Sequence, residues 1–189
     1  MRDMYFMLVS QKHMFAVLSD HEVMEGFNQF EAMLNFDKKA HEAMFGLGKL
    51  NFMIKRYELA ERWFEDALKQ KSDYVYRAWL GFTYIQLWKA VTPENPKGIK
   101  YLNYAVKNLT RCIKQDDLAP FTITVLLFLA VDLQKAALPP IKGLETPAKY
   151  LDGLTTCLRK QPKSIKLELA KAYIDLNSSN AQQGVTALN

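Results

Sequence analysis

The sequence has few cysteines and histidines, the residues that cross-link small domains and bind metal ions. Its two cysteines, Cys112 and Cys157, form no C-x-x-C motif and no Cys/His metal spacing, which excludes a disulfide framework. His13, His21 and His41 lack a metal-ligand spacing with one another. We therefore expect no metal and no other cofactor. The free cysteines fit a reducing intracellular compartment, for which we expect the cytoplasm.

Motifs for catalysis are absent as well. The sequence contains no P-loop, no G-x-G-x-x-G fingerprint and no G-x-S-x-G elbow. The stretch GLGKL, residues 46–50, has glycines and a lysine, but it lies inside a predicted helix with no strand before it. We therefore expect a protein that is not an enzyme and that takes no small-molecule substrate.

Long hydrophobic runs are also missing. The most apolar run, residues 121–131, reaches about 16 Å as a helix, whereas a membrane span needs roughly 30 Å. It is typical of a buried helix, so we expect no membrane span, and the first residues show no secretory signal. All eight methionines lie within residues 1–53. The spacing in MRDMYFM could present thioethers to Cu(I), but we interpret it as apolar packing.

What the sequence does contain favours helices. Of 189 residues, 49% are hydrophobic, while Gly and Pro number only 8 and 7. Leu, Ala, Lys, Met and Glu are plentiful, and these are good helix formers. The composition predicts an all-α globular protein.

Residues 41–70 carry two helical stripes that one helix cannot hold. Ala60, Trp63, Phe64, Ala67 and Leu68 follow the i, i+3, i+4, i+7 pattern. The stripe before them, from about residue 41 to 54, has a different phase. The pattern predicts two helices joined by a tight turn at residues 55–56.

The order of residue sizes in this hairpin resembles the tetratricopeptide repeat. Gly48, Ala60, Phe64 and Ala67 match its signature over 34 residues, with Asn51 where the family has Tyr. Other matches recur along the chain: Gly81 with Leu80 and Tyr84, Phe30 with Gly26 and Leu34, and LAKAY at 169–173.

Two later units of the repeat contain insertions. Ala105, Leu109 and Cys112 fill the slots of Ala60, Phe64 and Ala67, but only after an insertion of about a dozen residues between the paired helices. A second insertion precedes Tyr150, Leu154 and Cys157, which fill the same slots again. We expect the prolines in both inserts to end the first helix and to lie outside the second.

The resemblance implies one right-handed α-solenoid of antiparallel helix pairs over residues 1–189. The predicted units are 2–37, 41–73, 74–117, 119–162 and a partial unit 163–189. The tail is short for a capping helix, so the chain could be a piece of a longer protein.

The resemblance also implies where a partner binds, since the first helix of each pair lines the concave face in this family. Carried onto this chain, the partner-binding residues are Phe45, Lys49, Phe52, Met53, Phe82 and Ile85. Such a groove is mostly apolar and has one basic residue, which argues against a carboxylate clamp. It suits a helical or apolar protein segment, so we expect a scaffold or adaptor within a multiprotein complex. Members of this family serve in ciliary transport among other assemblies, so the resemblance implies a cytoskeletal or ciliary assembly as the alternative location.

The charge distribution leaves one alternative. Residues 1–95 carry 12 Lys/Arg and 13 Asp/Glu, whereas residues 96–189 carry 13 and 7, so the net charge of +5 is the sum of −1 and +6. A helical-repeat RNA-binding factor could use this basic half, notably Arg159, Lys160, Lys163 and Lys166. The spread of the lysines and the apolar groove favour a protein partner over nucleic acid.

Overall fold

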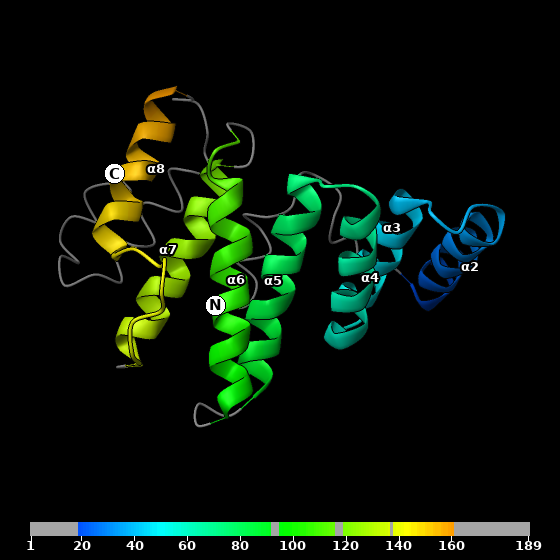
Figure 1. The fold of residues 1–189 in the computed structure, drawn as a ribbon, viewed down its shortest axis with the longest axis horizontal. Coiled ribbons are helices and arrows are strands. Elements are labelled where there is room, and N and C mark those ends of the chain that lie inside the picture. The colour runs from blue at the N-terminus through cyan, green and yellow to red at the C-terminus, as the bar shows by residue number, and fades with distance from the viewer. Residues whose placement is uncertain (1–18, 92–94, 116–118, 137, 161–189) are drawn as a thin grey trace. The chain divides into compact units, whose positions relative to one another are not determined.

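A computed structural model describes residues 19–91, 95–115, 119–136 and 138–160. These residues form seven α-helices and no strand (Figure 1), so the predicted all-α class is confirmed for this part of the chain. The helices are α2 (Asp20–Phe36), α3 (His41–Met53), α4 (Tyr57–Gln70), α5 (Tyr74–Ala90), α6 (Pro96–Cys112), α7 (Ala119–Lys135) and α8 (Pro147–Lys160). None of these described helices is long and apolar enough to cross a lipid bilayer.

The described residues divide into two compact units, residues 19–112 and residues 113–160. In the first unit each helix from α2 to α6 packs against the next, and α3 also contacts α5. In the second unit α7 packs against α8. The predicted single solenoid over residues 1–189 concerns how the units are arranged, and it stays a prediction.

The turn at residues 55–56 divides α3 from α4, as the phase of the apolar stripes predicts. The Lys55 N–H donates to the Phe52 carbonyl at 3.0 Å, and the Arg56 N–H donates to the Asn51 carbonyl at 2.8 Å. This pair of bonds is a Schellman motif, which requires a left-handed residue after the helix. Lys55 takes that conformation, with φ of 64°.

Replacing Lys55 with glycine should stabilise the protein by about 1 kcal/mol, because the left-handed backbone strains a residue that has a Cβ. Thermal or urea unfolding would measure the change. Arg56→Gly is the matched control: Arg56 has φ of −86°, so glycine relieves no strain there and should destabilise the protein. Equal effects of the two substitutions would contradict this account of the turn.

The second hairpin corrects the prediction of a dozen inserted residues between paired helices. The extra residues mostly lengthen the helices, since α5 and α6 each have 17 residues, against 13 and 14 in α3 and α4. Pro96 is the first residue of α6, where its missing N–H costs no hydrogen bond. Asn95 caps this helix by accepting from the Lys97 N–H at 2.9 Å. The second insert does form a long connection, since α7 ends at Lys135 and α8 begins at Pro147.

The predicted packing slots are filled by buried side chains. A Cβ built on Gly48 would lie 2.5 Å from the Phe64 ring, and one on Gly81 would lie 2.7 Å from Leu109. Phe64 and Leu109 therefore occupy equivalent places, as the repeat predicts. Further buried slot residues are Ala60, Ala67, Ala105, Cys112, Tyr150 and Leu154, whereas Cys157 is only partly buried.

Candidate partner-binding surfaces

The six predicted partner-binding residues lie on α3 and α5, but they are not equally accessible. Phe52, Phe82 and Ile85 are buried, with 4%, 6% and 2% of their surface exposed. Phe45, Lys49 and Met53 are half-buried. These last three remain available to a partner, and their role in binding stays a prediction.

Trp79 joins the predicted residues into an aromatic cluster. Its ring lies 5.4 Å from Phe52, 6.1 Å from Phe64 and 6.4 Å from Phe82, measured between centroids. Phe45 contacts Trp79 at 6.3 Å. The sequence analysis did not single out Trp79, which the structure places at the centre of this cluster.

Lys49 lies beside this cluster. Its amine is 5.7 Å from the ring centroids of both Phe45 and Trp79, within the range of a cation–π contact. Burial lowers the pKa of this lysine. Among the described residues no carboxylate pairs with the Lys49 amine, so the ring faces of Phe45 and Trp79 are the neighbours that stabilise its charge.

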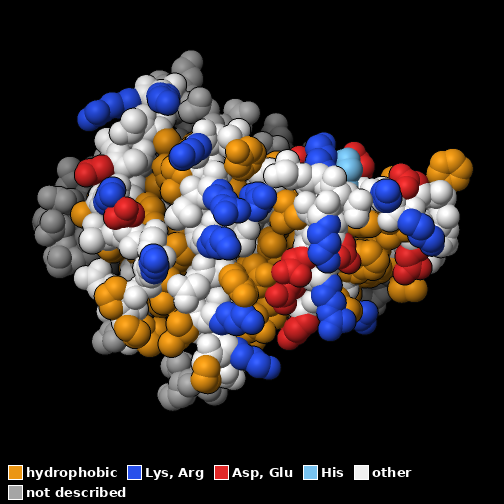
Figure 2. All heavy atoms as spheres, viewed as in Figure 1, with side chains coloured by type: hydrophobic (Ala, Val, Ile, Leu, Met, Phe, Trp, Pro, Cys, Tyr) orange, Lys and Arg blue, Asp and Glu red, His pale blue; other side chains and the backbone are white. Residues whose placement is uncertain are grey.

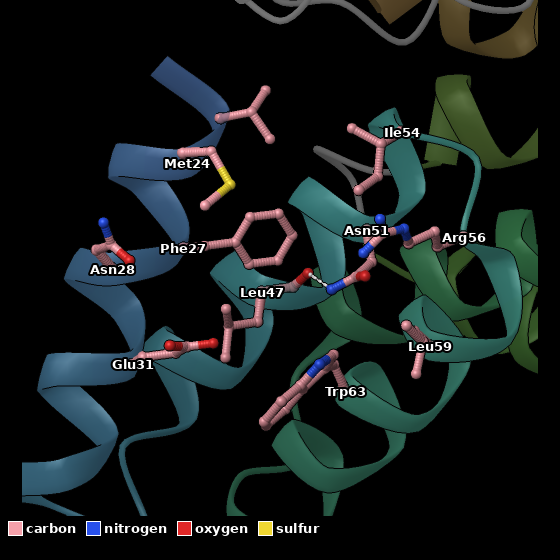
Figure 3. A pocket seen from close by; sticks show the side chains of 11 residues that line it. Met24, Phe27, Asn28, Glu31, Leu47, Asn51, Ile54, Arg56, Leu59 and Trp63 are labelled. Carbon is pink, nitrogen blue, oxygen red and sulfur yellow. Dashed lines mark hydrogen bonds between the residues drawn. The ribbon is translucent and has the colours of Figure 1, made fainter. Parts of the chain in front are cut away.

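A second surface, which the sequence prediction missed, is an open groove between α2, α3 and α4 (Figure 3). Its volume is about 600 Å³. Helix α3 forms the floor, and α2 and the first turns of α4 form the two walls. The lining residues are Val23, Met24, Phe27, Asn28, Glu31, Leu47, Asn51, Ile54, Arg56, Leu59 and Trp63.

The groove has an apolar lining that is partly open to solvent. Met24 and Leu59, on opposite walls, are 59% and 40% exposed. On the floor, Leu47 and Asn51 are almost completely buried, with 1% and 2% exposed. Large apolar side chains exposed on two facing walls are typical of a binding surface rather than of a free monomer surface.

Asn51 explains why the groove is open. In the next hairpin, the equivalent residue Tyr84 is buried between α4 and α6: its hydroxyl donates to the Glu65 carboxylate at 3.0 Å, and its ring lies 5.2 Å from that of Tyr104. Asn51 is much shorter and bonds instead to its own helix, donating from Nδ2 to the Leu47 carbonyl at 2.8 Å. The space that Tyr84 fills between α4, α5 and α6 is therefore left unfilled between α2, α3 and α4.

The groove carries opposite charges at its two ends. Helices α2 and α4 run in the same direction, and α3 runs against them, so Met24, Ile54 and Arg56 mark one end while Glu31 and Trp63 mark the other (Figure 3). Glu31 and Arg56 are exposed. Neither side chain has an ion pair or hydrogen bond within the part of the chain that the structure describes.

Charged side chains also gather by helix in the first unit. Figure 2 shows acidic side chains over α4 and basic side chains over α6. Burial, with Glu65 nearby, raises the pKa of Glu61. The exposed basic residues of α6 are Lys97, Lys100, Lys107 and Arg111, and the helix has no acidic residue. These basic residues precede in the sequence the predicted basic cluster that begins at Arg159.

The second unit has a hollow of its own, with a volume of about 570 Å³. It lies between α7 and the connection to α8, and Leu133, Leu138 and Ile141 are among its lining residues. Of the predicted basic cluster, Arg159 and Lys160 are exposed at the end of α8. Lys163, Lys166 and the methionine-rich residues 1–7 lie outside the described residues. Within the described ranges, no group of three or more His, Cys, Asp or Glu side chains could hold a metal ion.

Comparison with protein-family models, with curated proteins and with solved protein structures finds no match to this chain.

Proposed function

We propose that this protein is a non-catalytic scaffold or adaptor that binds an apolar, helical segment of a partner protein within a larger assembly. The binding site is the groove between α2, α3 and α4. The half-buried side chains of Phe45, Lys49 and Met53 provide a second contact surface. We further propose that the helix pairs form a right-handed solenoid of tetratricopeptide type, a proposal supported by the equivalent packing of Gly48 on Phe64 and of Gly81 on Leu109.

One observation carries the proposal: a groove of about 600 Å³ whose walls expose large apolar side chains. Three helices line the groove, and grooves of this shape take amphipathic helices through anchors at i, i+3, i+4 and i+7. A small molecule is a poorer match, because the lining has few polar groups that converge on one point.

Charging both walls should abolish capture of the partner. In the variant Met24→Asp with Leu59→Asp, a carboxylate faces the groove from each side, and desolvating it on binding is costly. Both positions are exposed, so we expect the free energy of unfolding to change by only about 0.5 kcal/mol per site. Affinity purification with mass spectrometry would compare the proteins that the wild type and the variant retain.

The matched control is Phe36→Asp with Ile99→Asp, which charges exposed apolar residues that do not line the groove. The control should retain the partner. Charging Phe52 and Phe82 would be less informative, because both are buried and the variant would test the core. Asn51→Tyr provides an independent variant, since the ring should fill the groove as Tyr84 fills the next one. Capture that survives both groove variants would reject the proposal.

A further inference from the structure

We propose, building on the proposed function, that the groove selects the direction and polarity of its ligand. The occupant is a helix of about two to three turns that lies parallel to α3. Its N-terminal end, which carries a basic residue, lies at Glu31, and its C-terminal end, which carries an acidic residue, lies at Arg56. In the middle of its apolar stripe stands one hydrogen-bond donor, opposite Asn51.

The dimensions of the groove set the length of the helix. Along α2 the lining runs from Val23 to Glu31, which spans about 12 Å at 1.5 Å per residue. The floor residues Leu47, Asn51 and Ile54 follow the i, i+4, i+7 spacing of one helical stripe. A facing helix would meet them with a stripe of the same spacing.

Charge sets the direction. A helix has a partial positive charge at its N-terminus and a partial negative charge at its C-terminus. Glu31 therefore favours the N-terminus at its end of the groove, and Arg56 favours the C-terminus at the other. The N-terminus of α4 adds to this second preference, because Arg56 is its N-cap residue and makes no side-chain capping bond. The resulting helix runs antiparallel to both walls, α2 and α4, so neighbouring helix dipoles are opposed.

Asn51 sets the position of the polar residue. It is 2% exposed, and its amide nitrogen is bonded to the Leu47 carbonyl. Within the described part of the chain nothing donates to the Asn51 side-chain oxygen. A purely apolar ligand would leave this buried oxygen without a partner, which is unfavourable. A serine, threonine or glutamine in the ligand would satisfy it, in the way that one buried polar residue fixes register between paired helices.

The test uses three fluorescein-labelled helical peptides with one leucine stripe. The forward peptide has Lys at its N-terminal end, Ser at the centre and Glu at its C-terminal end; the reversed peptide exchanges Lys and Glu; the apolar peptide replaces Ser with Leu. Fluorescence anisotropy against the full chain should give a dissociation constant about tenfold lower for the forward than for the reversed peptide. The double variant Glu31→Arg with Arg56→Glu should invert this order, which separates groove charges from the helix propensity of the peptides. Asn51→Leu should favour the apolar peptide over the forward one.

The outcomes distinguish the two proposals. Equal binding of forward and reversed peptides, or an order that the charge exchange leaves unchanged, overturns the direction but leaves the proposed function standing. If no peptide binds, or if Met24→Asp with Leu59→Asp leaves binding intact, the groove is not a helix site and the proposed function falls too. If the wild type elutes as a dimer in size-exclusion chromatography and that wall variant elutes as a monomer, the occupant is a second copy and the partner proposal is overturned.

Discussion

Trp79→Ala is expected to lower the free energy of unfolding by about 3–5 kcal/mol, the range for removing a large aromatic side chain from a core. Trp79 is 7% exposed and contacts rings from three helices, namely Phe52 on α3, Phe64 on α4 and Phe82 on α5. Edge-to-face and tilted aromatic pairs add to the loss of buried area. Urea unfolding followed by circular dichroism at 222 nm would measure the change.

The control for this substitution lies one turn earlier on the same helix. Val75 is 40% exposed, so Val75→Ala removes little buried area and improves helix propensity. We expect a change within about 0.5 kcal/mol. The Trp79→Ala protein should also lose the cation–π contact of Lys49 with the indole. If Trp79→Ala unfolded at the same urea concentration as the wild type, the aromatic cluster would not be the core of this unit.

The helix pairs were predictable because their determinants are local. The change of apolar phase at residues 55–56 needs only the sequence of one hairpin, and the Schellman bonds of Lys55 and Arg56 agree with it. The packing of Leu109 on Gly81 followed from the repeat spacing, because the slot requires a small residue facing a large one. The insertion before α6 was mispredicted since Pro96 is compatible with the first turn of a helix, and so did not exclude the inserted residues from it.

The groove could not be predicted in the same way, because an open space depends on three helices at once. The signal was nevertheless present in the sequence: Asn51 stands where the repeat signature has Tyr and where the next hairpin has Tyr84. Reading that departure as missing volume, rather than as a weak match, would have identified the site. The burial of Phe52 and Phe82 was missed for a related reason. A helical pattern indicates which face a residue occupies, and it does not indicate how closely the next helix approaches that face.

The close contact of Gly48 with Phe64 predicts a large loss of stability when the glycine is replaced. A Cβ at residue 48 would lie 2.5 Å from the ring of Phe64, which is 0% exposed and surrounded by Phe45 and Trp79. Because that ring is completely buried, it can move only by displacing its neighbours, so we expect Gly48→Ala to destabilise the protein by about 1–3 kcal/mol. This loss should appear even though alanine gains about 1 kcal/mol of helix propensity over glycine. Gly153→Ala is the control: its Cβ would meet Ile123 at an ordinary 3.5 Å, so the propensity gain should make that variant more stable.

A double-mutant cycle identifies the cause of the loss. Phe64→Leu alone should destabilise the protein, because it shortens a fully buried side chain and leaves a cavity above Gly48. Combined with Gly48→Ala, the new methyl group enters the space that the ring has vacated. The double variant should therefore be more stable than the sum of the single changes predicts, with a coupling free energy of about 1 kcal/mol or more. Strict additivity would mean that Gly48 is required for a reason other than the approach of Phe64. The slot that relates this hairpin to the one containing Gly81 and Leu109 would then lose its physical basis.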